Sequence, residues 1–166
     1  LTGALHAIGR KGETPVPPLN LVGDFGGGAL YLAFGMACAL FEARGSGKGQ
    51  IVDCAMTDGA ASLMTMFYGM KAAGMWSPER DSNLLDGGAH FYDTYECADG
   101  QWLAIGPIEP QFHARLVKGL GLPDDAFGSY MDRTKWPEFS GRVAKIVKTK
   151  CRDDWMKVFD GTDACV

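Results

Sequence analysis

Histidine is scarce in this sequence, and the patterns that usually mark a metal or disulfide site are missing. The 166 residues include three histidines and five cysteines, with no CxxC or other metal-ligand spacing. An odd number of scattered cysteines indicates reduced thiols in a reducing compartment: Cys38, Cys54, Cys97, Cys151 and Cys165. We therefore expect no bound metal and no metal or redox cofactor.

Concentrated basic charge and long apolar runs are also missing. The formal net charge is −4 and no basic face precedes residue 142, so a nucleic-acid partner is not expected. No uninterrupted apolar run reaches membrane-spanning length and no signal peptide is visible, so we expect no membrane partner. The chain starts at Leu1 and stops at the apolar Val166 without a closing helix, which suggests an internal piece of a longer protein.

Turn-forming residues divide the sequence into two parts. Residues 76–87 are rich in them and are interpreted as a linker. Residues 1–75 are expected to form part of a larger α/β domain. Residues 88–166 are expected to form a smaller α+β domain, which is truncated here.

The first part is expected to contain two long helices and a strand. Ala29–Ala43 is apolar nearly all round, which is typical of a helix buried on several faces. Gln50–Ala55 is predicted to be a short strand. Met56–Ala73 has apolar residues at helical spacing and is predicted to be the second helix.

The second part begins with the pattern of a β-hairpin. Phe91–Cys97 alternates aromatic and polar residues, Asp99-Gly100 is a strong turn signal, and Trp102–Ile105 is the predicted return strand. Three helices are expected after it, one from Pro110, one over Trp136–Lys148 and one starting near Asp153.

A single carboxylate, Asp24, precedes the glycines Gly26, Gly27 and Gly28 and the long apolar helix. Glycine lets the backbone turn sharply and lets another molecule approach it. A helix start presents unpaired N–H groups and a partial positive charge. Asp24 is therefore interpreted either as a helix N-cap or as an acid/base group at the mouth of a site.

A second candidate carboxylate is Glu109, which lies between Ile108 and Pro110 at a predicted helix start. The helix dipole alone could explain a carboxylate there. Methionines also recur along the second predicted helix. They are interpreted either as filling for irregular core gaps or as an adaptable binding surface.

Four blocks of the sequence carry a family resemblance. They follow one another as in the α-methylacyl-CoA racemases, which are members of the family III CoA-transferases, and the likeness covers essentially the whole chain. The blocks are residues 19–28 (LNLVGDFGGG), 45–59 (GSGKGQIVDCAMTDG), 84–100 (LLDGGAHFYDTYECADG) and 106–112 (GPIEPQF).

The resemblance implies a fold, a substrate and an assembly. The fold would be that of a family III CoA-transferase, with part of a Rossmann-like large α/β domain, a smaller α+β domain and an interlaced homodimer in the full-length protein. The substrate would be a branched-chain acyl-CoA, whose coenzyme A is part of the substrate and not a cofactor. The location would be cytoplasmic in a bacterium, and mitochondrial or peroxisomal in a eukaryote.

The resemblance also implies roles for individual residues. Asp24 would be one of two bases that move the α-proton through an enolate, and its partner His would lie upstream of Leu1, so His6 is not its equivalent. Glu109 would lie beside that His in the second subunit. The residues expected to bind substrate are Gly26, Gly27, Gly28, Met56, Met64, Met66, Met70 and Ile108.

The sequence departs from the racemase pattern at two positions. His90 stands where Pro is common, and His113 where Tyr is common.

In a CoA-transferase, the residue at Asp24 would be a nucleophile that forms an acyl anhydride, but residues 87–90 lack the longer glycine run of those enzymes. A third interpretation is that these residues are non-catalytic on their own and serve only as a dimerising or acyl-CoA-binding piece.

Overall fold

The computed structural model describes residues 1–166, which form two compact units, Leu1–Arg80 and Asp81–Val166. The boundary between the units falls within the stretch 76–87. The only sheet is a two-stranded one in the second unit, so the chain has mixed helical and strand content with a small sheet.

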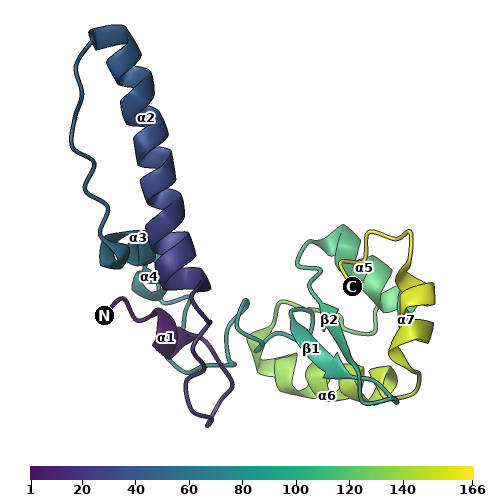
Figure 1. Ribbon diagram of the computed structural model, residues 1–166. Helices are drawn as coiled ribbons and strands as arrows, with labels where there is room; N and C mark the ends of the chain where they lie inside the picture. The colour runs from purple at the N-terminus through teal and green to yellow at the C-terminus, as the bar shows by residue number, and fades with distance from the viewer. The chain divides into compact units, whose positions relative to one another are not determined.

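The first unit contains helices and no strands. The predicted strand at Gln50–Ala55 is wrong, because a strand needs a hydrogen-bonded neighbour and this segment has none. Instead, the segment returns alongside α2, where Gln50 Nε2 donates to Glu42 Oε2 at 3.4 Å (Figure 1). The elements are α1 (Ala4–Ala7), the π-helix η1 (Leu21–Leu30), α2 (Tyr31–Ser46), α3 (Met56–Leu63) and α4 (Thr65–Ala72).

The glycine run is itself helical, whereas the sequence predicts a helix only from Ala29. The helical stretch therefore covers Leu21–Ser46, 26 residues, and is long and apolar enough to cross a membrane by length and composition alone. The sequence-based expectation concerned uninterrupted apolar runs, and Asp24, Glu42 and Arg44 interrupt this helical stretch. The core helix of a soluble protein passes the same test, so the test does not identify a membrane span.

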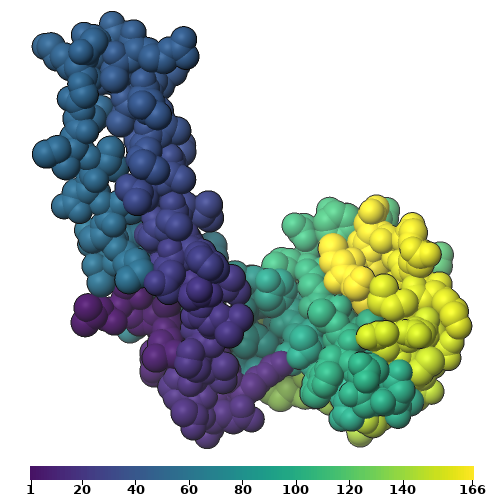
Figure 2. All heavy atoms as spheres, in the orientation of Figure 1, coloured from purple at the N-terminus to yellow at the C-terminus, as the bar shows by residue number.

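The α2 helix has no buried residue within this chain, although its composition predicted burial on several faces. Phe34 is 72% exposed and Phe41 is 82% exposed. The end of α2 stands clear of the other helices of its unit (Figure 1), and the same segment projects in the space-filling view (Figure 2). The prediction of burial is wrong for these 166 residues because they supply too few neighbours to cover the helix.

The predicted helix over Met56–Ala73 is present as two shorter helices. α3 ends at Leu63 and α4 begins at Thr65. Met64 lies between them as the cap residue of both helices, with φ −87° and ψ −1°. Met64 is also the buried residue at this junction. α3 packs along η1, which brings the second predicted helix against the glycine run.

The second unit begins with the predicted β-hairpin, which is confirmed. β1 (Asp93–Glu96) and β2 (Trp102–Ile105) are antiparallel, with Asp93 opposite Ile105 and Glu96 opposite Trp102. The predicted helices are also present, as α5 (Pro110–Gly119), α6 (Trp136–Val147) and α7 (Arg152–Phe159), with the short 3₁₀ helix η2 (Arg133–Lys135) before α6. α6 packs against β1 (Figure 1).

This unit has a continuous core of its own. Inward-facing residues of the hairpin meet the apolar faces of α5, α6 and α7. The largest buried side chains are Trp155, Phe91, Phe127, Leu116 and His90. Such burial supplies the main favourable term for folding, and the core of the second unit is built from its own residues.

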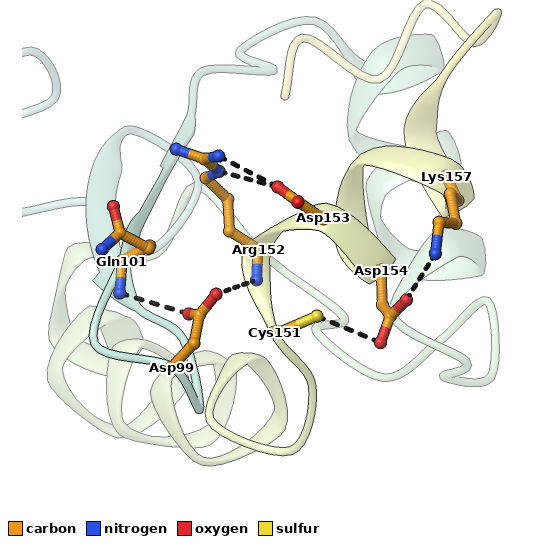
Figure 3. Close-up of polar contacts among 7 residues, drawn as sticks. All are labelled: Asp99, Gln101, Cys151, Arg152, Asp153, Asp154 and Lys157. Atoms are coloured by element: carbon orange, nitrogen blue, oxygen red, sulfur yellow. Dashed lines mark hydrogen bonds and ion pairs between the residues drawn. The ribbon is translucent and has the colours of Figure 1, made fainter.

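The hairpin turn is tied to the start of α7 through Asp99 (Figure 3). One carboxylate oxygen of Asp99 accepts a hydrogen bond from the Gln101 N–H at 3.2 Å. The other accepts from the N–H of Arg152, the first residue of α7, at 3.2 Å. The carboxylate thus satisfies an N–H that has no acceptor within its own helix.

Candidate active site

Asp24 lies in the first turn of η1 with an exposed side chain. It is not the N-cap of that helix, because Asn20 occupies the cap position. The cap interpretation of Asp24 is therefore wrong. A carboxylate in the first turn is still favoured by the helix dipole, and its exposure leaves it accessible to a substrate.

η1 has the wider turns of a π-helix. The N–H of Phe25 donates to the carbonyl of Asn20, five residues back, at 3.0 Å. π-helical turns are rare and frequently occur at functional sites. Asp24 thus lies in an unusual backbone segment and not in an ordinary helix end.

The three consecutive glycines of η1, Gly26, Gly27 and Gly28, face α3. A Cβ added to Gly26 would meet the Leu63 side chain at 3.0 Å, and one added to Gly28 would meet the Met56 side chain at 3.0 Å. Gly27 is buried against the backbone of Ala60. Gly28 also accepts a weak hydrogen bond from Cys54 Sγ at 3.6 Å.

The four methionines predicted to bind substrate have different environments. Met56 and Met66 are exposed, Met70 is half-buried and Met64 is buried at the junction of α3 and α4. Met56 lies against Gly28 and close to Gly23, so it borders the glycine run of η1.

Glu109 and Ile108 lie at the start of α5 in the second unit. Glu109 is exposed and occupies the N-cap position, but its side chain makes no capping hydrogen bond. Tyr130 Oη donates to the carbonyl of Ile108 at 3.1 Å and so fixes the residue before Glu109. Burial raises the pKa of Tyr130, and the nearby charge of Glu109 adds to the shift.

The two histidines that depart from the racemase pattern are buried together. Nε2 of His90 lies 3.4 Å from Nε2 of His113, and the His113 ring stacks on Tyr130 with centroids 4.0 Å apart. Burial lowers the pKa of His90 to about 3, with a further contribution from His113, and burial lowers the pKa of His113 to about 4. Both rings are therefore neutral core groups at physiological pH.

The structure brings the predicted residues together in two groups. Asp24 and the glycine run lie in η1, and Met56 of α3 borders that run. Ile108 and Glu109 share the start of α5. Sequence reasoning did not single out Gly59 or Tyr130 as residues of the site. For Gly59 the only available signal was a small residue inside an apolar helix pattern. Within residues 1–166, no group of three or more His, Cys, Asp or Glu side chains could hold a metal ion.

Curated proteins similar to this chain include two with the same name. The alpha-methylacyl-CoA racemase of Mus musculus is 48% identical over 166 residues, and that of Homo sapiens is 46% identical over 166 residues. Each match covers 100% of this chain and 44% of the relative, so the chain spans less than half the length of these relatives. The succinyl-CoA–D-citramalate CoA-transferase of Chloroflexus aurantiacus is 29% identical over 123 residues, 74% of this chain and 30% of the relative.

A solved structure and a family model agree with these matches. The crystal structure of Rv3272 from Mycobacterium tuberculosis has a TM-score of 0.69 and 20% identity, over 95% of this chain and 42% of that one. This likeness concerns the fold alone. The model of CoA-transferase family III matches residues 1–166. The chain therefore belongs to CoA-transferase family III.

Proposed function

We propose that the full-length protein interconverts the two configurations of a 2-methylacyl-CoA thioester. The observation that carries this proposal is the 48% and 46% identity to two proteins named alpha-methylacyl-CoA racemase, over every residue of the chain. Two proteins named CoA-transferases are only 29% and 27% identical. The exposed carboxylate and the glycine run lie in the matched region.

The reaction removes the α-proton of the thioester on one face and returns a proton on the other. Asp24 is proposed as the base on one face, because its carboxylate is exposed in the first turn of η1. The C–H bond breaks, its proton passes to the carboxylate, and its electron pair moves into the thioester carbonyl as an enolate. A second base, proposed to be a His upstream of Leu1, donates the proton on the opposite face.

The negative charge of the enolate oxygen needs preorganised donors. The first N–H groups of η1 have no acceptors within the helix and carry the positive end of its dipole. Such groups stabilise a developing oxyanion effectively when they are already in position. We place the thioester beside this turn, with Gly26, Gly27, Gly28 and Met56 around it. Coenzyme A is part of the substrate, and the proposed chemistry calls for no metal or redox cofactor.

The remaining parts of the proposal concern the whole protein. The first unit is proposed to complete a Rossmann-like large domain with segments outside these 166 residues, and two chains are proposed to interlace as a homodimer. Glu109 is then proposed to lie beside the catalytic His of the second subunit, with Ile108 next to the substrate. Met64, Met66 and Met70 are proposed to contribute to an acyl-binding surface.

CoA transfer is the second candidate, favoured by the similarity to proteins named CoA-transferases. In that reaction the Asp24 carboxylate attacks the thioester carbonyl, the C–S bond breaks and CoA leaves as a thiolate. The thiolate then attacks the Asp24 carbonyl of the resulting acyl anhydride, which releases the first acyl group as its carboxylate and leaves a CoA thioester on Asp24. The carboxylate of an acceptor acid repeats these two steps in reverse, so that CoA passes to the acceptor and Asp24 is regenerated. The same carboxylate can serve both reactions, so the substrate's α-proton is the group to observe.

The test uses the full-length protein with a 2-methylacyl-CoA in D₂O. We expect deuterium at the α-carbon and loss of optical purity, both followed by NMR. Asp24→Asn should abolish the inversion, whereas Asp53→Asn, which changes an exposed carboxylate outside the proposed site, should not. Absence of exchange, with CoA passing to an added carboxylic acid, would contradict the racemase proposal and support the transferase.

A further inference from the structure

The π-helix that carries Asp24 contacts α3 through backbone atoms. Gly27 of η1 lies so close to α3 that an added Cβ would come within 2.6 Å of the Ala60 nitrogen and 3.0 Å of its Cα. A Cβ on Gly59 of α3 would overlap the carbonyl oxygen of Gly27. The two helices therefore touch at a pair of glycines, with no side chain between them.

Conformational freedom does not explain these two glycines. Neither Gly27 nor Gly59 has a positive φ, and both lie inside helices where alanine fits the backbone. Glycine in a helix interior costs roughly 0.5–1 kcal/mol relative to alanine. The close approach of the two backbones is what requires the absence of a Cβ at both positions.

The residues around this contact hold η1 in one register on α3. Met56, Gly59, Ala60 and Leu63 have the spacing of one helix face, and each meets a glycine of η1. Tyr31, which follows η1, donates its hydroxyl hydrogen to Ser62 Oγ at 2.7 Å. η1 can therefore neither slide nor rise over α3 without losing several contacts.

We propose that Gly59 is a positioning residue for Asp24, because the Gly27–Gly59 contact sets how deeply η1 lies on α3. Asp24 is three residues before Gly27 in the same helix, so its carboxylate moves with the contact. This inference rests on the proposed function, in which Asp24 takes the α-proton on one face. A displacement of about 1 Å at a reacting group can cost about 100-fold in rate.

The test compares Gly59→Ala with the wild type in the full-length protein, using each enantiomer of the 2-methylacyl-CoA in D₂O. Displacement of Asp24 should lower kcat for inversion about 100-fold with little change in KM. The enantiomer whose α-proton faces Asp24 should lose its deuterium exchange. The other enantiomer should keep exchange, because the opposite base still removes and returns its proton.

The ratio of the two exchange rates separates positioning from a general loss of structure. A smaller folded fraction lowers exchange from both enantiomers equally, so equal loss would overturn the proposal, as would an unchanged kcat. Gly141→Ala in α6 is the matched control, since nothing lies within 4 Å of the added Cβ, and it should leave both rates unchanged.

A second variant covers the case in which Gly59→Ala does not fold. If Gly59→Ala does not fold, Gly27→Ala places a Cβ 2.6 Å from the Ala60 nitrogen, a smaller overlap at the same contact, and should give the same one-sided loss. Equal or absent loss in that variant overturns the positioning role.

If the wild type transfers CoA without α-proton exchange, the proposed function fails by itself. Gly59→Ala is then measured by its transfer rate, and an unchanged rate overturns the positioning role.

Discussion

Nε2 of His90 and Nε2 of His113 lie 3.4 Å apart in the core of the second unit, with the rings nearly perpendicular at 86°. A hydrogen bond between these atoms requires a proton on one Nε2 and a lone pair on the other, because a neutral imidazole has one N–H and one acceptor nitrogen. Nδ1 of His90 is buried and has no hydrogen-bond partner. A proton on that atom would be an unsatisfied buried donor, so the structure favours His90 with its proton on Nε2.

This tautomer assignment is the first prediction. In ¹⁵N-labelled protein, His90 should show a protonated Nε2 and an unprotonated Nδ1, and His113 the opposite arrangement. His6→Gln removes the remaining histidine and so assigns the signals of the pair. A protonated Nδ1 on His90 at neutral pH would contradict the assignment.

The second prediction concerns the pH dependence of stability. Burial holds the pKa of His90 at about 3 and that of His113 at about 4, against 6.5 for a free imidazole. The unfolded chain therefore binds more protons than the folded chain below about pH 6.5. The free energy of unfolding should be independent of the pair above that pH. It should fall as the pH drops toward 4, by at most about 1.4 kcal/mol per pH unit for each histidine.

Urea unfolding between pH 4 and pH 7.5, followed by tryptophan fluorescence, measures this slope. Carboxylates also titrate at the lower end, so a variant that lacks both imidazoles is the control. In His90→Leu/His113→Phe the slope between pH 5 and pH 6.5 should largely disappear. An unchanged slope in that variant would assign the acid sensitivity to other groups.

The third prediction concerns the link between the hairpin and α7. Asp99→Ala removes the acceptor for the first N–H of α7 and for the Gln101 N–H. Helix-capping carboxylates contribute about 1 kcal/mol, so the unfolding midpoint should fall accordingly. Asp124→Ala, at an exposed carboxylate in the loop after α5, should leave the midpoint unchanged. Equal midpoints for the two variants would show that the link does not stabilise the unit.

The sequence predicted local structure well where local chemistry decides it. The hairpin was predicted correctly because alternation and the Asp99-Gly100 turn both act within a few residues. The sequence predicts a helix only from Ala29, whereas the glycine run before it is also helical and packs against α3. The strand expected at Gln50–Ala55 was wrong because pairing depends on a neighbouring strand, which local pattern cannot supply.

In the candidate site too, local residue types could be predicted from the sequence and long-range contacts could not. The types of residue at Asp24 and Glu109, together with the resemblance, were enough to single them out. The role of Gly59 depends on a contact with Gly27, 32 positions earlier in the numbering, and the His90–His113 pair depends on a contact across 23 positions. Neither long-range contact has a periodic or spacing signal in a single sequence.

The fourth prediction is that residues 81–166 fold alone and residues 1–80 do not. The second unit buries its apolar residues in one continuous core. The first unit exposes large apolar side chains, including Phe34, Leu40 and Phe41, and contiguous exposed apolar surface promotes association. Residues 81–166 should be monomeric by light scattering, with one cooperative melting transition. Residues 1–80 should form large assemblies, and replacing Phe34 and Phe41 by Glu should reduce them. A cooperative, monomeric 1–80 would show that its helices need no further covering.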